Sequence, residues 1–225
     1  AEFLLETVME LEPGHHDAEI QLTHVLLRRQ RFHKAHARAK SLYQRFDQPP
    51  QQVQALYASV CFGVGENDEA IRVYQKMIRE MPNDPALRVS LAHIYNATGE
   101  SHLAIDLFKQ AYELNPSFGD AFWSLANTKS YRFTDDEVTA MTERLSLDAT
   151  PELDRIQMHF ALGKAHEDSH NFAVAFDNYQ QGNALKLATS NHSRQQLDIR
   201  VSTQLDVCTA SLFDRLGDVG HDAPD

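Results

Sequence analysis

A period of about 34 residues is the feature of this sequence that most restricts its fold. Small residues recur at Ala1, Ala35, Ala70 and Ala104, with spacings of 34, 35 and 34. The same register returns a glycine, an aromatic residue and a proline, each pair 34 residues apart: Gly65 and Gly99, Tyr74 and Phe108, Pro82 and Pro116. A unit of this length buries its apolar face only by stacking on its neighbours. The chain is therefore predicted to have one core that runs through successive units.

The unit 85–118 shows why each repeated residue type is needed. Its apolar residues return at helical spacing in two runs, which predicts two amphipathic helices. Ala92 and Ala104 have short side chains, so the two helices are expected to approach closely. Gly99 falls between them, where the end of a helix favours a residue that tolerates positive φ. Pro116 follows the second helix and stops it.

This combination of small, aromatic, glycine and proline positions closely resembles the tetratricopeptide repeat. The resemblance implies an all-α fold, a right-handed α-α superhelix of about five helix-turn-helix repeats with a C-terminal capping helix. The expected units are 16–50, 51–84, 85–118, 119–152 and 156–189, of which 119–152 is degenerate. In that unit Lys129 stands where an aromatic residue is expected, although Thr134–Glu137 still fits a capping box at the start of its second helix.

The two ends of the chain depart from the repeat. Residues 1–15 match only the second helix of a truncated repeat, which leaves room for self-association through the open N-terminal repeat. Residues 190–216 are predicted to form one capping helix, with Ser193 as its N-cap and an apolar stripe that includes Cys208. The polar segment 217–225 is predicted to be a tail or linker.

Composition limits the classes of partner. The chain has 21 Lys and Arg against 32 Asp and Glu, a net charge of −11, which argues against nucleic acid and against anionic membrane surfaces. No apolar run approaches the roughly 20 residues needed to span a bilayer. We expect a cytoplasmic protein whose partner is another protein or a peptide.

The sequence offers little for catalysis or for metal binding. His166 and His170 have the i, i+4 spacing of two ligands on one helix face, but no third ligand is placed beside them, so no metal site is predicted. Cys61 and Cys208 are interpreted as small buried apolar residues. Phosphate-binding loops and nucleophilic motifs are absent, so we expect a chain that is not an enzyme and holds no cofactor.

The tetratricopeptide resemblance also implies where a partner would bind. The first helices of the repeats would line a concave groove, whose mixture of aromatic, Asn and His side chains suits an extended peptide or a helix. The residues predicted to face that groove are Ile20, His24, Leu27, Arg28, Ser59, Phe62, Val89, His93, Asn96, Trp123, Asn127, Tyr131, Phe160 and Lys164. For Trp123, filling the core around the degenerate repeat is an equally weighted alternative.

A second resemblance covers residues 119–225. The segments 119–127 and 159–165, together with 182–186, resemble the N-terminal repeat region of bacterial tetratricopeptide-containing sulfotransferases, and 222–225 resembles the approach to the catalytic domain. This implies that the chain is the non-catalytic part of a protein that transfers sulfuryl from phosphoadenosine phosphosulfate. A free-standing adaptor without a partner domain is the alternative.

Overall fold

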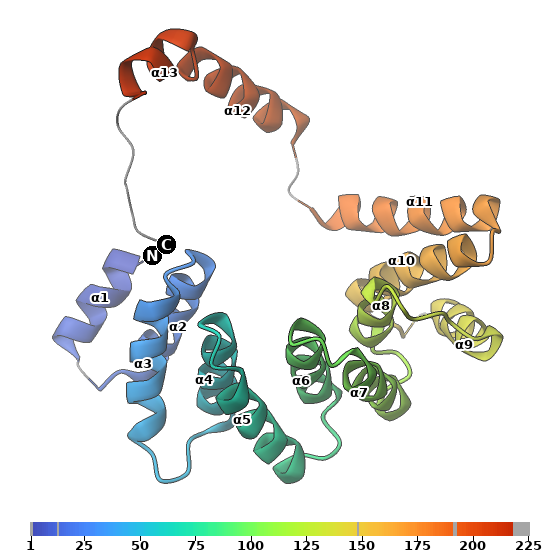
Figure 1. Ribbon diagram of the computed structural model, residues 1–225, viewed down its shortest axis with the longest axis horizontal. Helices are drawn as coiled ribbons and strands as arrows, with labels where there is room; N and C mark the ends of the chain where they lie inside the picture. The colour runs from blue at the N-terminus through green and yellow to red at the C-terminus, as the bar shows by residue number, and fades with distance from the viewer. Residues whose placement is uncertain (1, 13, 148, 191–192, 218–225) are drawn as a thin grey trace. The chain divides into compact units, whose positions relative to one another are not determined.

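The computed structural model describes residues 2–12, 14–147, 149–190 and 193–217, and within these ranges every regular element is an α-helix (Figure 1). The expectation of an all-α fold is confirmed. The predicted tail, apart from Gly217, lies outside the described residues. The chain divides into two compact units, Ala1–Gly182 and Asn183–Asp225.

The first three repeats of the first unit are helical hairpins, and a single helix, α1 (Glu2–Leu11), precedes them. The hairpins pair α2 (His16–Arg28) with α3 (Phe32–Gln44), α4 (Gln51–Gly63) with α5 (Asn67–Glu80), and α6 (Pro85–Ala97) with α7 (Ser101–Leu114). Beyond them α8 (Gly119–Asn127) packs against α10 (Glu152–Asp168), which α9 (Asp135–Leu145) also contacts, and α11 (Phe172–Thr189) follows α10. Helix α10 begins four residues before the predicted start at 156, directly after Pro151, whose fixed φ suits the residue preceding a helix.

Alanines hold the two helices of a hairpin close together. Ala35, Ala70 and Ala104, the small residues of the repeat, are all 0 % exposed. Each starts the buried face of a second helix, and larger residues such as Phe108 complete it. Because these side chains are short, the space between helices is filled without separating the backbones.

Four interhelical turns place a residue in the left-handed region. These residues are Gln30 at φ 57°, Gly65 at 84°, Gly99 at 89° and His170 at 61°. In each turn the following N–H donates to a carbonyl five residues earlier, as Glu100 does to Tyr95 at 2.8 Å. This closes the end of the first helix and sets the direction of the second. The role predicted for Gly99 is confirmed.

The degenerate unit keeps its second helix through a buried carboxylate. Glu137 is 8 % exposed and completes the predicted capping box with Thr134, whose backbone N–H donates to it at 2.9 Å. It also accepts hydrogen bonds from the hydroxyls of Tyr112, at 2.7 Å, and Tyr131. Burial by itself raises the pKa of Glu137, but these hydrogen bonds outweigh it and hold the pKa below its ordinary value.

The C-terminal segment corrects the expectation of one helix across 190–216. The structure has two helices, α12 (Arg194–Val207) and α13 (Ala210–Leu216). The break comes at Cys208 because the hydroxyl of Thr209 accepts the N–H of Leu212 at 3.3 Å and begins a new helix. Ser193 caps α12 as predicted. Cys208 is exposed, not buried as expected, whereas Cys61 is buried. The capping role of this segment stays a prediction.

The left-handed turns yield a stability prediction. Substituting Gln30→Gly or His170→Gly should each raise the free energy of unfolding by about 1 kcal/mol, because a side chain at positive φ is strained. Gly99→Ala should lower it by a similar amount. Urea unfolding of the three variants measures the differences. Equal stability of all variants and the wild type would show that the turns carry no strain.

Glu137 yields a pH-dependent prediction. Glu137→Gln should lower the free energy of unfolding by about 2 kcal/mol near neutral pH, because two hydroxyls and a backbone N–H lose a charged acceptor. The folded pKa of Glu137 lies below its unfolded value of about 4.3. The stabilisation is therefore present above that pH and is lost as pH falls through the folded pKa.

Denaturant unfolding of the wild type and Glu137→Gln at a series of pH values tests this. The two curves should converge under acidic conditions. A difference that stays constant with pH would contradict a charge-dependent role for Glu137.

Candidate peptide-binding surface

Four of the predicted groove residues lie around one hollow between α8, α10 and α11. Trp123, Asn127, Phe160 and Lys164 line a cavity of about 270 Å³, together with Ala126, Lys129 and Tyr179. The rings form a row, with centroids 5.4 Å apart between Trp123 and Phe160 and 6.4 Å apart between Phe160 and Tyr179. Its volume is below the range of ordinary small-molecule sites and is suited to one large side chain.

Tyr179 reaches the hollow because α10 carries a glycine opposite it. A Cβ at Gly163 would lie 2.4 Å from the Tyr179 ring, so any larger residue would displace that ring. The Tyr179 hydroxyl donates to Oε2 of Glu167 at 2.8 Å. Burial, followed by this hydrogen bond and the nearby carboxylates, raises the pKa of Tyr179, so the hydroxyl remains a neutral donor. One wall of the hollow is thus held by packing and by a hydrogen bond.

The two lysines of the hollow differ in their partners. Lys164 forms an ion pair with Asp168 one turn along α10, and Asp168 also lies 3.4 Å from Arg132. Lys129 is exposed and forms no ion pair within the part of the chain that the structure describes. Lys129 therefore supplies a positive charge that a partner can use, in a chain whose net charge is −11.

A second hollow adjoins the first. It has a volume of about 320 Å³ and shares Asn127 and Lys129 with the aromatic hollow. Asn96 and Ser101 line its other side, with the Ser101 hydroxyl 3.4 Å from Oδ1 of Asn96. The two hollows form one surface, defined here as the aromatic-lysine surface, which runs from Asn96 to Tyr179.

Two predicted groove residues are core residues. Ile20 is 4 % exposed and Val89 is 3 % exposed, so neither is available to a partner. Val89 packs in a cluster that includes Ala121 and Leu125, which belong to the first helix of the next repeat. That neighbour covers the position, and the prediction is corrected for both residues.

Other predicted positions contribute to packing. Tyr131 directs its hydroxyl to Glu137 and its ring to Phe133, at 5.2 Å between centroids. His93 places its ring 5.4 Å from Phe108, and its Nε2 is 3.5 Å from the Ser124 hydroxyl. These contacts join neighbouring segments within and between repeats, and neither Tyr131 nor His93 lines either hollow.

The predicted residues of the first two repeats lie apart from this surface. Leu27 and Phe62 are half-buried against the core, and His24 is half-buried on α2. Arg28 and Ser59 are exposed on α2 and α4. None of these five lines either hollow. Whether a partner extends over them stays a prediction.

Six residues that line the two hollows were missing from the prediction: Ser101, Ala126, Thr128, Lys129, Ser130 and Tyr179. Lys129 stands where the repeat pattern expects an aromatic residue, and this departure was the sequence signal that could have placed it on the binding surface. Tyr179 lies on the second helix of its unit, where the repeat pattern predicts contact with the first helix and no contact with a ligand. Its approach to Gly163 becomes visible only in three dimensions.

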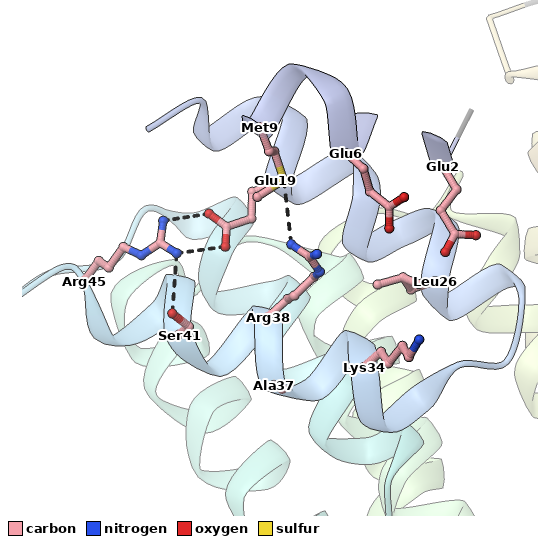
Figure 2. Close-up of a pocket in the computed structure, with 10 residues that line it drawn as sticks. All are labelled: Glu2, Glu6, Met9, Glu19, Leu26, Lys34, Ala37, Arg38, Ser41 and Arg45. Atoms are coloured by element: carbon pink, nitrogen blue, oxygen red, sulfur yellow. Dashed lines mark hydrogen bonds and ion pairs between the residues drawn. The ribbon is translucent and has the colours of Figure 1, made fainter. Parts of the chain in front are cut away.

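Another cleft, lined by both charged and apolar residues, lies at the N-terminal end of the first unit (Figure 2). It has a volume of about 540 Å³ and is lined by residues of α1, α2 and α3. Glu19 is 3 % exposed and receives two hydrogen bonds from Arg45, at 2.7 and 2.9 Å. Glu2 pairs with Arg29 and Arg31. Three carboxylates and three cationic side chains line the cleft, so its lining favours neither sign of ligand charge: Glu2, Glu6, Glu19, Lys34, Arg38 and Arg45.

Comparison with known proteins identifies the repeat. Residues 86–118 match the model of the tetratricopeptide repeat family. No curated protein sequence matches the chain. BtubC from P. vanneervenii shares 14 % identity, with 85 % of this chain and 89 % of that chain covered at a TM-score of 0.58. MamA 41-end from Desulfovibrio magneticus RS-1 shares 17 % identity over 78 % of this chain and 97 % of that chain, at a TM-score of 0.51.

A human IFIT1 dimer with PPP-AAAA has a TM-score of 0.62 at 17 % identity, where 85 % of this chain corresponds to 45 % of that chain. At these identities the likeness concerns the fold. The chain has the fold of a tetratricopeptide solenoid. Among the described residues of this solenoid, no helix has the length and apolar character needed to cross a bilayer.

Proposed function

We propose that this tetratricopeptide solenoid is a non-enzymatic scaffold that captures a peptide on its aromatic-lysine surface. The observation that carries the proposal is the row of Trp123, Phe160 and Tyr179 around a hollow that Lys129 also lines. Aromatic anchors in a well-packed pocket dominate the affinity of many interfaces. A helical-repeat scaffold is consistent with protein binding, and the surface supplies the specific contacts.

The chemistry of the surface specifies the peptide. The hollow of about 270 Å³ fits one apolar or aromatic side chain. Lys129 is positioned to meet a carboxylate of the same peptide, and the exposed amides of Asn96 and Asn127 are suited to its backbone. We therefore expect an extended segment with an apolar anchor and an acidic residue close to it.

The single tryptophan of the chain gives a direct test. Peptides selected from a displayed library should change the emission of Trp123 on binding. Phe160→Ala and Lys129→Ala should each weaken that binding, the first by at least tenfold because an anchor contact is lost. Lys76→Ala removes the same charge from α5, away from the surface, and should leave affinity unchanged.

Circular dichroism separates binding from folding in these variants. If Phe160→Ala and Lys129→Ala keep full affinity while the fold is intact, the proposed surface is not the binding site. If only the melting temperature falls, the aromatic residues act as core, which was the alternative for Trp123.

We also propose that the chain is the non-catalytic N-terminal region of a sulfotransferase. The support is the resemblance of residues 119–225 described above, and the parent would then use phosphoadenosine phosphosulfate as its donor. The alternative is a free-standing adaptor. Sequencing the gene beyond the codon for Asp225 distinguishes them. A following strand and phosphosulfate-binding loop supports the proposal, and a stop codon at that point contradicts it.

A further inference from the structure

Three side chains of metal-binding type converge where α3, α4 and the start of α5 meet. They are His36 on α3, Cys61 on α4 and Glu66, the N-cap residue of α5. One potential ligand atom from each lies within 4.8 Å of the other two. This cluster is separate from the aromatic-lysine surface.

The local fold explains the convergence. The left-handed turn at Gly65 lets the N–H of Glu66 donate to the carbonyl of Cys61 at 2.9 Å, which turns Glu66 back over the end of α4. His36 follows Ala35, the small residue of the repeat. At the matching positions, 35 and then 34 residues later, the chain has Ile71 and Ile105. A histidine on α3 therefore stands where the next two second helices, α5 and α7, have an apolar packing residue.

The histidine brings a nitrogen that packing does not explain. Nε2 of His36 is buried, and it lies 3.2 Å from Oε2 of Glu66 without the geometry of a hydrogen bond. Among the described residues it has no hydrogen-bond partner. The ring itself is held parallel to Tyr57, with centroids 6.3 Å apart and 12° between the planes. A buried polar atom without a partner is uncommon and points to a missing ligand.

We propose that His36, Cys61 and Glu66 bind a Zn²⁺ ion, with water as the fourth ligand. Zinc takes thiolate, imidazole and carboxylate together in tetrahedral geometry, whereas Ca²⁺ and Mg²⁺ take oxygen ligands. With Zn–ligand bonds of about 2.0 to 2.3 Å, tetrahedral ligand atoms lie roughly 3.3 to 3.8 Å apart. Side-chain adjustments of roughly 1 Å would bring the three groups to that geometry. Glu66 has an exposed side chain, which leaves a path for the ion and the water.

The burial of Cys61 distinguishes a metal ligand from a nucleophile. The Cys61 side chain is 0 % exposed, which is unsuited to nucleophilic catalysis with His36. A bound metal ion displaces the proton from a coordinating thiol.

The surroundings suit the charge of a bound ion. The Tyr57 hydroxyl, which lies beside Cys61, would orient and stabilise the coordinated thiolate from outside the ligand set. Lys40 contributes positive charge near Cys61, but Glu69 contributes negative charge there. Two ionised ligands, Cys61 and Glu66, would neutralise a divalent ion. Binding would join α3, α4 and α5 through their side chains.

Cobalt titration tests the site on the full chain, freed of any affinity tag, reduced and stripped of metal. One Co²⁺ per chain should bind with a thiolate-to-cobalt absorption band and the visible bands of tetrahedral cobalt, and Zn²⁺ should displace it. Cys61→Ser and His36→Gln should abolish the thiolate band or weaken binding at least tenfold, as expected for loss of a ligand. Glu66→Gln should weaken binding.

Cys208→Ser and His33→Gln are the matched controls, since each changes the same residue type outside the cluster, and both should bind cobalt as the wild type does. Circular dichroism confirms that each variant is folded, and His36→Gln, which alters a half-buried ring, serves if Cys61→Ser does not fold. Three results overturn the proposal. They are a wild type without the band, a band that survives both ligand substitutions, and a band lost in Cys208→Ser.

Discussion

The close approach of paired helices at alanine-sized positions is the constraint on which the rest of this structure depends. Ala35, Ala70 and Ala104 are fully buried, and each faces the first helix of its own hairpin. A larger residue there would separate the helices and open the core along the whole stack, because interiors are close-packed. The left-handed turns follow from the same constraint. Two helices this close need a tight connection, and a residue at positive φ supplies it.

Local chemistry explains why much of the fold was predictable. Ser193 and the Thr134–Glu137 box were predicted from a few adjacent residues, and both caps are present, because capping depends on neighbours in the chain. How far a side chain is exposed to solvent depends instead on contacts with other repeats, which are distant in the sequence. Ile20 and Val89 have groove positions by analogy, yet neighbouring elements bury them. In the same way, the division into α12 and α13 rests on one threonine hydroxyl competing with helix continuation.

The irregular repeat shows how a departure from the pattern can create a binding surface. In the unit 85–118, Tyr95 is half-buried and packs against the core. The residue 34 positions later is Lys129, which is exposed and lines the hollow instead of filling it. Helix α8 correspondingly ends at Asn127 after 9 residues, whereas α6 has 13. Space that an aromatic residue would occupy in a regular unit is available here to a partner.

His36 is a second departure from the repeat pattern, at the place where α3, α4 and the start of α5 meet. The repeat places apolar residues, Ile71 and Ile105, at the positions that match His36. A histidine there whose Nε2 has no hydrogen-bond partner among the described residues costs stability unless something binds it. Oε2 of Glu66 lies 3.2 Å from this nitrogen, but Glu66 is held beside Cys61 by the turn and not by the histidine. The same turn recurs at Gly99, where Tyr95 and Glu100 stand in the matching places and the counterpart of His36 is Ile71, which has no ligand atoms to offer. The same type of turn thus supports the proposed metal site at one hairpin and plain packing at another, and two side chains, His36 and Cys61, make the difference.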